Sequence, residues 1–311
     1  MIKVLASDGM EKSAVATLRE KGYEVTEQFY EPEELAQKVK EYDVLVVRSA
    51  TKVRQPIIDA AVEGGRLKLV IRGGVGVDNI DVKYAEEKGI KVTNTPRASS
   101  ASVAELTLGH MLSLCRYIGI ANVTMRNGEW NKKKYEGIEL NGKTLGLIGM
   151  GRIAQEVAKR AVALGMKVVY NDIFEIKGLP AEYVSMSRDE VLKTADFVSL
   201  HIPMPEDKKP VITASELALM KPTAFILNLA RGGLVCEDAL CDALDNGKLA
   251  GAVGIVTNLL LFAVKITVGL LFHSIAIMAD AVNNLSDSAS SIITLVGFKL
   301  SGKPADAKHP Y

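Results

Sequence analysis

Short apolar runs alternate with segments of helical spacing along the first 98 residues. Runs rich in Val, Ile and Leu are typical of strands that are buried on both faces, and short helices between them allow parallel pairing. The pattern therefore predicts a complete small α/β domain over residues 1–98, with a doubly wound parallel sheet. The expected strands are KVLASD, YEVTEQ, DVLVVRS, LKLVIRGG and IKVTNTP, and the expected helices are Lys12–Lys21, Pro32–Glu41, Pro56–Val62 and Val82–Lys88.

A second domain is predicted over residues 99–255. It begins with apolar residues at helical spacing from Ser99 to Arg126, a segment long enough to form one helix that bridges the two domains. Strands and helices then alternate again, as expected for a second doubly wound parallel sheet of the nucleotide-binding type. After a strand–helix–strand unit at Lys143–Asp172, the expected elements are helix Arg188–Lys193, strand DFVSLHIP, helix Ala214–Met220, strand AFILNLA, helix Glu237–Asp245 and strand LAGAVGI.

The strand–helix–strand unit contains a dinucleotide-binding fingerprint. Gly149, Gly151 and Ala154 occupy its three small positions, directly after an apolar strand and at the start of a helix. The first glycine allows the tight turn, the second lets the backbone approach a pyrophosphate, and the small third residue lets helix and strand pack. Asp172 follows at about twenty residues' distance, where a carboxylate binds both ribose hydroxyls and repels a 2′-phosphate. The pattern favours NAD over NADP as the cofactor; the alternative is a purely structural βαβ unit.

Ligands of such sheets bind beyond the carboxyl ends of the strands. In the second domain these ends carry Asp172, His201 with Pro203, and Ala230 with Arg231. His201 has the chemistry of an acid–base catalyst. The planar guanidinium of Arg231 suits bidentate binding of a carboxylate, and the alternative is a surface arginine at a strand end.

Composition narrows the classes of protein that fit. Of the 311 residues, 48% are hydrophobic and 24% are charged, with a formal net charge of +1, so two cores are possible and no nucleic-acid partner is indicated. Cys115, Cys236 and Cys241 form neither a zinc pattern nor a disulfide framework, which favours a reducing cytoplasm. The first residues, MIKVLASDGM, lack the long apolar core of a signal peptide.

The chain becomes almost continuously apolar after the second domain. Ile255–Phe272 contains a single charge, Lys265, and is about long enough for a membrane span. In the following segment Asp280, Asn283 and Asp287 share one helical stripe. Such residues face a bundle interior or an ion path in a membrane, whereas in water they would form the wet face of an amphipathic helix. The prediction is a hydrophobic helical hairpin over residues 256–311, which would tether the chain to a membrane.

Several motifs, in order along residues 1–255, resemble the D-2-hydroxyacid dehydrogenases and in particular their phosphoglycerate dehydrogenase branch. They are VRSATKV, RGGVGVDNID, NTPRASSASVAEL, ELNGKTLGLIGMGRIA, HIP and NLARGG. The resemblance implies a flavodoxin-like substrate domain followed by a Rossmann NAD-binding domain. It also implies a cytoplasmic homodimer that oxidises a small 2-hydroxy acid, D-3-phosphoglycerate, with NAD in serine biosynthesis.

The resemblance also implies roles for individual residues. Arg231 would bind the carboxylate and carbonyl of a 2-oxo acid and polarise that carbonyl for hydride transfer, and Arg48 and Arg72 would meet a substrate phosphate. His201 and Pro203 would shape the cofactor pocket rather than carry out acid–base chemistry. The implied substrate-binding residues are Arg48, Ser49, Arg72, Val75 and Gly76; the implied cofactor-binding residues are Gly149, Gly151, Arg152, Ile153, Asp172, His201, Pro203 and Ala230.

The sequence departs from this family after Gly254-Ile255. Family members continue with an Asp-Val-Phe segment, a Glu-x-Pro turn and a later Pro-His pair, whose Glu and His form the proton-transfer dyad. This sequence contains none of them. Loss of a general acid costs a factor of about 100 to 10,000 in rate, so the expected dehydrogenase is weakly active or inactive.

The tail resembles the first two transmembrane helices of the cation diffusion facilitator family, through HSIAIMADAVNNLSD and the closing KPADAKHPY. By that resemblance Asn283 and Asp287 would form half of a divalent-cation site with oxygen ligands. Two incomplete families that meet near residue 255 suggest a deletion fusion, a frameshift or an assembly error. The alternatives are a membrane-tethered dehydrogenase, a fragment of a cation efflux transporter and an NAD-binding module without catalysis.

Overall fold

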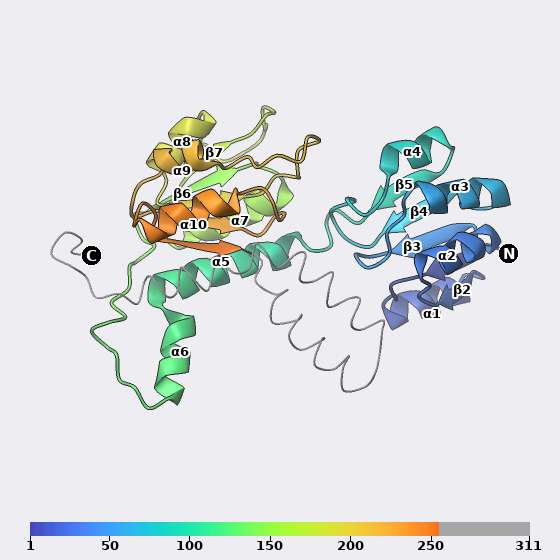
Figure 1. Ribbon diagram of the computed structural model, residues 1–311, viewed down its shortest axis with the longest axis horizontal. Helices are drawn as coiled ribbons and strands as arrows, with labels where there is room; N and C mark the ends of the chain where they lie inside the picture. The colour runs from blue at the N-terminus through green and yellow to red at the C-terminus, as the bar shows by residue number, and fades with distance from the viewer. Residues whose placement is uncertain (255–311) are drawn as a thin grey trace. The chain divides into compact units, whose positions relative to one another are not determined.

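The computed structural model describes residues 1–254 (Figure 1). The chain separates into two compact units with their boundary between Ser100 and Ala101.

The first unit is built on a five-stranded sheet in the order β2-β1-β3-β4-β5, with every neighbouring pair parallel. This is the flavodoxin-like order, in which the chain reverses its direction of winding between β1 and β3. The prediction of a parallel α/β sheet is therefore confirmed. The strands are β1 Lys3–Ala6, β2 Glu24–Glu27, β3 Val44–Val47, β4 Leu69–Arg72 and β5 Lys91–Asn94, and the helices are α1 Lys12–Glu20, α2 Pro32–Lys38, the 3₁₀ turn Val39–Glu41, α3 Gln55–Gly64 and α4 Val82–Glu87.

Apolar side chains on the two faces of this sheet meet different helices. One face packs against α2, α3 and α4, where Leu35, Ile58 and Ala85 are buried among Leu5, Leu45 and Val70 of the central strands. On the other face the described cluster is smaller and joins Val15 of α1 to β1 and β2. Burial on both faces explains the nearly continuous apolar sequence of the central strands.

The second unit is built on a six-stranded parallel sheet in the order β11-β10-β9-β6-β7-β8. This is the Rossmann order, with its reversal between β6 and β9. The short edge strand β8 was absent from the sequence prediction because its three residues carry no clear alternation. The strands are β6 Thr144–Ile148, β7 Lys167–Asn171, β8 Tyr183–Ser185, β9 Phe197–Leu200, β10 Phe225–Asn228 and β11 Gly251–Gly254, and the helices are α5 Ser100–Arg116, α6 Ile118–Arg126, α7 Arg152–Ala163, α8 Arg188–Thr194, α9 Ala214–Leu219 and α10 Glu237–Asp245.

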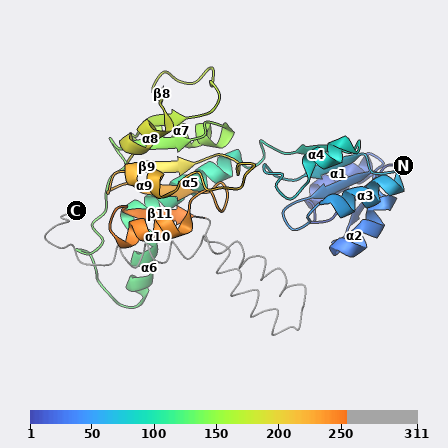
Figure 2. The same ribbon diagram turned by 45° about the horizontal axis from the view of Figure 1, so that its top comes forward.

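Helices cover both faces of this second sheet (Figure 2). α8, α9 and α10 bury one face, and α5 and α7 bury the other. Gly146 lies in β6, where an added Cβ would stand 2.7 Å from Cγ1 of Val191 and 2.8 Å from Cβ of Ala195. A glycine in this strand therefore allows α8 to pack closely on the sheet.

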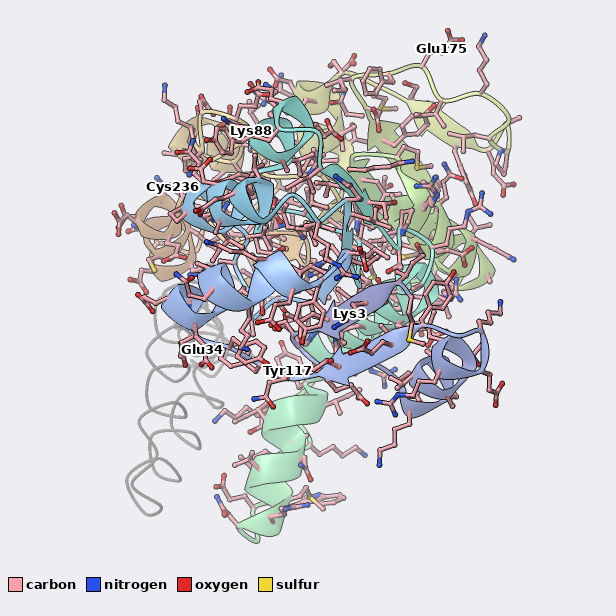
Figure 3. The ribbon with its side chains drawn as sticks, turned by 90° about the vertical axis from the view of Figure 1, so that its right-hand side faces the viewer. Lys3, Glu34, Lys88, Tyr117, Glu175 and Cys236 are labelled. Carbon is pink, nitrogen blue, oxygen red and sulfur yellow. The ribbon has the colours of Figure 1, made fainter. Side chains whose placement is uncertain are left out.

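The predicted single helix over Ser99–Arg126 is wrong: α5 ends at Arg116 and α6 begins at Ile118. Tyr117 between them has a φ of 54°, in the left-handed region, and Figure 3 labels it at the start of α6. Its ring stacks on Tyr135 with centroids 5.7 Å apart. The carbonyl of Cys115 accepts a hydrogen bond from the N–H of Ile138 at 3.0 Å. Apolar spacing alone does not reveal this break, because the pattern continues on both sides of it.

The predicted C-terminal hairpin at 256–311, with its candidate ligands Asn283 and Asp287, lies outside the described residues. Within residues 1–254 no helix has the length and apolar character needed to cross a membrane. The same part of the chain contains no cluster of His, Cys, Asp and Glu side chains able to hold a metal ion.

Candidate functional site

The predicted site residues fall into two groups, one in each unit. The cofactor group lies at the carboxyl ends of β6, β7, β9 and β10, around the reversal in strand order between β6 and β9, where ligands of open α/β sheets bind. Gly149 directly follows β6 with a φ of +88°, and its N–H donates to the carbonyl of Asn171 at 2.8 Å. A Cβ at this position would stand 2.7 Å from the carbonyl oxygen of His201. Both the φ and the close approach require glycine here.

The absence of a side chain at Gly151 is not explained by its backbone conformation or its packing. Its φ of −72° is open to any residue, and among residues 1–254 no heavy atom outside its chain neighbours would lie within 4 Å of an added Cβ. Neither strain nor packing therefore explains a glycine at this position, and the open space above it suits a ligand that approaches the backbone.

The start of α7 presents donors to that space. In the described chain the N–H groups of Gly151, Arg152 and Ile153 have no hydrogen-bond partner, no side chain caps the helix, and its first turn contains no acid. By contrast, Ser187 and Glu190 close the start of α8 with a capping box. Free N–H groups and the positive end of the helix dipole together favour an anion, as a dinucleotide pyrophosphate would be.

Asp172 follows β7 and is tied to the glycine turn. Its Oδ2 accepts the N–H of Met150 at 2.7 Å and its Oδ1 accepts the N–H of Phe174 at 3.0 Å. Each carboxylate oxygen has a further lone pair, and the side chain is only half-buried. Ile173 and Phe174 beside it are 87% and 70% exposed, so the end of β7 presents a carboxylate next to apolar surface. This combination fits an adenosine ribose and its base.

His201 follows β9, and burial lowers the pKa of its imidazole to about 4. The ring Nε2 of His201 lies 2.9 Å from Oγ of Ser199, a fully buried side chain. The backbone N–H of His201 donates to the carbonyl of Ile148 at 2.8 Å. A ring that is neutral near pH 7 and held on β9 favours a role in shaping the pocket over proton transfer. Pro203, two residues further on, is exposed.

Arg231 lies in the loop after β10, and Asn228 holds the backbone of that loop. Nδ2 of Asn228 donates to the carbonyl of Arg231 at 2.8 Å, and its Oδ1 accepts the N–H of Ala230 at 3.3 Å. The guanidinium of Arg231 donates to the carbonyl of Ala230 at 2.8 Å and is half-buried. The predicted catalytic arginine and the predicted nicotinamide neighbour Ala230 thus belong to one constrained turn.

In the first unit, the predicted substrate residues come from two adjoining loops. Arg48 and Ser49 follow β3 and are exposed, and Val75 and Gly76 follow β4 and are half-buried. The N–H groups of Val75 and Gly76 have no hydrogen-bond partner among residues 1–254, whereas the carbonyl of Val75 accepts from Nδ2 of Asn94 at 2.5 Å. Adjacent unpaired N–H groups in a glycine-rich turn form a suitable cradle for a carboxylate.

Arg72, also expected to meet a phosphate, is the last residue of β4. Its guanidinium folds over the following turn, since an added Cβ on Gly74 would stand 1.3 Å from Nη1. Gly74 has a φ of +153°, and glycine is required there on both counts. The structure thus places Arg72 next to the Val75–Gly76 turn but half-buried, while Arg48 is exposed.

Sequence reasoning missed the side chains that hold these loops. Asn94 and Asn228 are the last residues of β5 and β10, and each donates to a carbonyl of a neighbouring loop. Asp8 stands two residues after β1 and binds the loop after β3. An asparagine or aspartate at the end of an apolar run was the available signal.

Comparison with known proteins identifies relatives of both parts of the chain. Residues 108–257 match the family model "D-isomer specific 2-hydroxyacid dehydrogenase, NAD binding domain". Residues 252–311 match the model "Cation efflux transmembrane domain", a segment that lies almost wholly outside the described residues.

Two curated relatives differ in how much of their length the chain spans. A hydroxypyruvate reductase of Thermotoga maritima is 48% identical over 252 residues, which are 80% of this chain and 81% of the relative. A D-3-phosphoglycerate dehydrogenase of Methanocaldococcus jannaschii is 46% identical over 256 residues, 81% of this chain but 48% of the relative. The chain therefore spans about half the length of that phosphoglycerate dehydrogenase.

Solved structures agree with the architecture. The TT0316 protein of Thermus thermophilus superposes with a TM-score of 0.73 at 38% identity, covering 81% of each chain. A D-2-hydroxyisocaproate dehydrogenase superposes with a TM-score of 0.70 at 28% identity, covering 81% of this chain and 77% of that one.

Proposed function

This chain belongs to the D-isomer specific 2-hydroxyacid dehydrogenase family, whose enzymes use NAD, and from that premise we propose that its substrate is D-3-phosphoglycerate. The observation that carries the choice is the pair of adjoining loops in the first unit. A phosphorylated 2-hydroxy acid bears two anionic groups, and these loops offer two kinds of anion ligand. The unpaired N–H groups of Val75 and Gly76 suit the carboxylate, and Arg48 with Ser49 suits the phosphate.

The residues of the second unit are assigned roles according to the part of the cofactor that each would contact. The turn at Gly149 and Gly151 and the free N–H groups of Arg152 and Ile153 would hold the pyrophosphate, and Asp172 would bind the adenosine ribose. Ala230, His201 and Pro203 would line the nicotinamide end. Arg231 would bind and polarise the carbonyl of the 2-oxo acid, because its planar guanidinium can donate two parallel hydrogen bonds.

The proton for the forming alkoxide has no evident source in the sequence. The Glu and His that the family resemblance implies would follow residue 255, where the sequence continues with IVTNLLLFAV instead. His201 is a poor substitute for this proton donor, because burial lowers its pKa to about 4 and leaves the imidazole neutral near pH 7. We therefore expect turnover lower than that of an enzyme with the dyad by a factor of about 100 to 10,000, with NAD binding retained.

The test is a direct assay of the purified full chain. NADH production from D-3-phosphoglycerate should be slow but measurable, and titration with NADH should show saturable binding. Turnover of tens per second would refute the loss of the proton donor, since that is an ordinary rate for intact enzymes. Absence of NADH binding would refute the cofactor assignment itself.

Hydroxypyruvate is the second candidate substrate. The observation that favours it is the Thermotoga maritima hydroxypyruvate reductase, which the chain matches over 81% of its length. Relative values of kcat/KM for hydroxypyruvate reduction and D-3-phosphoglycerate oxidation separate the two. Replacing Arg48 should impair the phosphorylated acid alone.

The tail supports a competing hypothesis. If residues 252–311 act as their match to the cation efflux transmembrane domain suggests, the chain would be a membrane-held NAD-binding module or a transporter fragment rather than a working cytoplasmic dehydrogenase. Extraction with and without detergent distinguishes the two. Sequencing of the junction near residue 255 from an independent source decides whether the fusion is genuine.

A homodimer through the second unit is part of the same proposal. Exposed apolar side chains gather on α6 and the segment after it, with Ile118 and Val123 each 54% exposed, Met125 52% and Trp130 77%. Several large apolar side chains exposed on one segment favour a protein interface there. Analytical ultracentrifugation should show a dimer that Val123→Glu weakens.

A further inference from the structure

We propose that Asp8 and Asn79 are positioning residues that hold the loop Arg48–Thr51 in the conformation that receives the anionic substrate. The proposal rests on the proposed function in one respect, that this loop contacts substrate. Neither residue is expected to touch the reacting atoms. Their role follows from hydrogen bonds that converge on a single short loop at the carboxyl edge of the first sheet.

Asp8 closes the loop from the side of β1. Its carboxylate accepts the N–H of Arg48 at 2.6 Å, the N–H of Thr51 at 3.1 Å and the hydroxyl of Thr51. That hydroxyl also lies 2.8 Å from Oγ of Ser7. Ser7 and Thr51 are 2% and 4% exposed, so much of this network is shielded from water. Hydrogen bonds to a carboxylate are about twice as strong as those between neutral groups.

Asn79 closes the loop from the side of β4. Its Nδ2 donates to the carbonyl of Arg48 at 2.8 Å and to the carbonyl of Thr51 at 2.7 Å. The backbone carbonyl of Asn79 accepts the N–H of Val53 at 2.8 Å, next to a parallel bridge between Val53 and Ile80. Arg48 and Thr51 are therefore each bound on their N–H by Asp8 and on their carbonyl by Asn79.

This arrangement divides the donors of the loop. Asp8 accepts the N–H groups of Arg48 and Thr51, the first and last residues of the loop. The N–H groups of Ser49 and Ala50 and the hydroxyl of Ser49 have no hydrogen-bond partner in the described part of the protein. The unused groups lie at the exposed tip, beside the exposed Arg48. The carboxylate of Asp8 is thus hydrogen-bonded to donors of the protein, whereas the donors at the tip of the loop remain available to bind an anion. Asn79 also belongs to the loop that follows Val75 and Gly76, so it fixes the two substrate loops to each other.

Preorganisation of this kind lowers the entropic cost of binding, because the loop is already ordered when the substrate arrives. The anchors should therefore affect substrate affinity while leaving NADH affinity, which depends on the second unit, unchanged. A residue needed only for folding would speed hydrogen exchange throughout the first unit, so acceleration confined to the loop distinguishes the two roles.

The experiment uses the full chain and three substitutions with matched controls. Asp8→Asn keeps the size of the side chain but removes its negative charge and one of its two acceptor oxygens. Asn79→Asp replaces the donor with a carboxylate that faces two carbonyls. Thr51→Val removes the hydroxyl, and Thr51→Ser restores it. Asp59→Asn, which alters only an exposed hydrogen bond from Tyr84, is the control for change of charge.

Two measurements are made on each variant. Hydrogen exchange of peptides covering residues 48–51 reports the loop itself, and calorimetric titration with D-3-phosphoglycerate and separately with NADH reports binding. In Asp8→Asn, Asn79→Asp and Thr51→Val we expect exchange of the loop to accelerate about tenfold and the Kd for D-3-phosphoglycerate to rise about tenfold or more. The Kd for NADH should stay within about twofold of the wild type, and Thr51→Ser and Asp59→Asn should match the wild type.

Unchanged loop exchange in these variants would overturn the proposal, and so would unchanged affinity for an acid that the wild type binds. If the wild type does not bind D-3-phosphoglycerate but the variants lose loop protection, the anchors stand and the proposed substrate fails. If Asp8→Asn does not fold, the Thr51→Val and Thr51→Ser pair decides by the same two measurements.

Discussion

Replacement of Gly151 by Ala should separate cofactor binding from folding. The φ of −72° at this position suits alanine, and in the described part of the chain no atom beyond the two neighbouring residues lies within 4 Å of the Cβ that would be added. The folded protein should therefore accept the methyl group without strain. Reduced freedom of the unfolded chain should even raise the free energy of unfolding, by about 0.4 to 1 kcal/mol.

The cost should appear when NADH binds. The new Cβ would occupy the space that a pyrophosphate needs to reach the N–H groups of Gly151, Arg152 and Ile153. One hydrogen bond to a charged group contributes about 1.5 to 3 kcal/mol. Loss of one such contact therefore raises the Kd for NADH by a factor of about 10 to 150, since each 1.4 kcal/mol is tenfold.

Fluorescence titration with NADH and thermal unfolding of the same preparation measure the two effects. Gly149→Ala is the contrasting variant, because a φ of +88° and a Cβ 2.7 Å from the carbonyl of His201 should destabilise the fold by roughly 2 to 5 kcal/mol. The reasoning is refuted if Gly151→Ala lowers the melting temperature, or if it binds NADH as tightly as the wild type.

Three further predictions concern the second unit. Asp172→Ser should reduce the preference for NADH over NADPH by about tenfold or more in paired binding titrations, because it removes the carboxylate that would repel a 2′-phosphate. His201 should make stability sensitive to acid: its pKa falls from 6.5 to about 4 in the folded state, so its contribution is complete above pH 6.5 and is lost as the pH falls towards 4. Urea unfolding across that range should show a loss of roughly 3 kcal/mol that His201→Gln lacks. Arg231→Lys should weaken binding of hydroxypyruvate to the chain loaded with oxidised NAD, which cannot donate a hydride, about tenfold by calorimetry, because an ammonium cannot donate the parallel pair of hydrogen bonds.

Most of the fold was predictable because both sheets are parallel and buried. Their central strands are nearly continuous apolar runs, and the short helices between the strands leave few alternatives for the pairing. What the periodicity could not reveal was local: the break at Tyr117 depends on a ring that stacks on Tyr135, far along the chain, and β8 is too short to show alternation. Tertiary contacts decide both features.

The two groups of site residues differ in how visible they are from sequence. In the second unit the two loops at the reversal of strand order approach backbone to backbone, and only glycine at 149 permits that approach. In the first unit the corresponding loops, after β1 and β3, are joined by the carboxylate of Asp8 instead. A glycine trio at fixed spacing can be found in a sequence, whereas an aspartate after a strand has many ordinary explanations.

That difference also predicts which positions tolerate change. Packing requires glycine at position 149 but not at position 151. Selection for folding alone would therefore conserve Gly149 and allow other residues at position 151. Asp8 is only half-buried, but its oxygens satisfy the N–H groups of Arg48 and Thr51 beside the buried hydroxyls of Ser7 and Thr51. An apolar side chain at position 8 would leave those donors unsatisfied, at a cost of about 1 to 3 kcal/mol for each one that water does not reach. Position 8 is thus constrained by the loop that it holds, and we propose that position 151 is constrained by a cofactor that approaches its backbone.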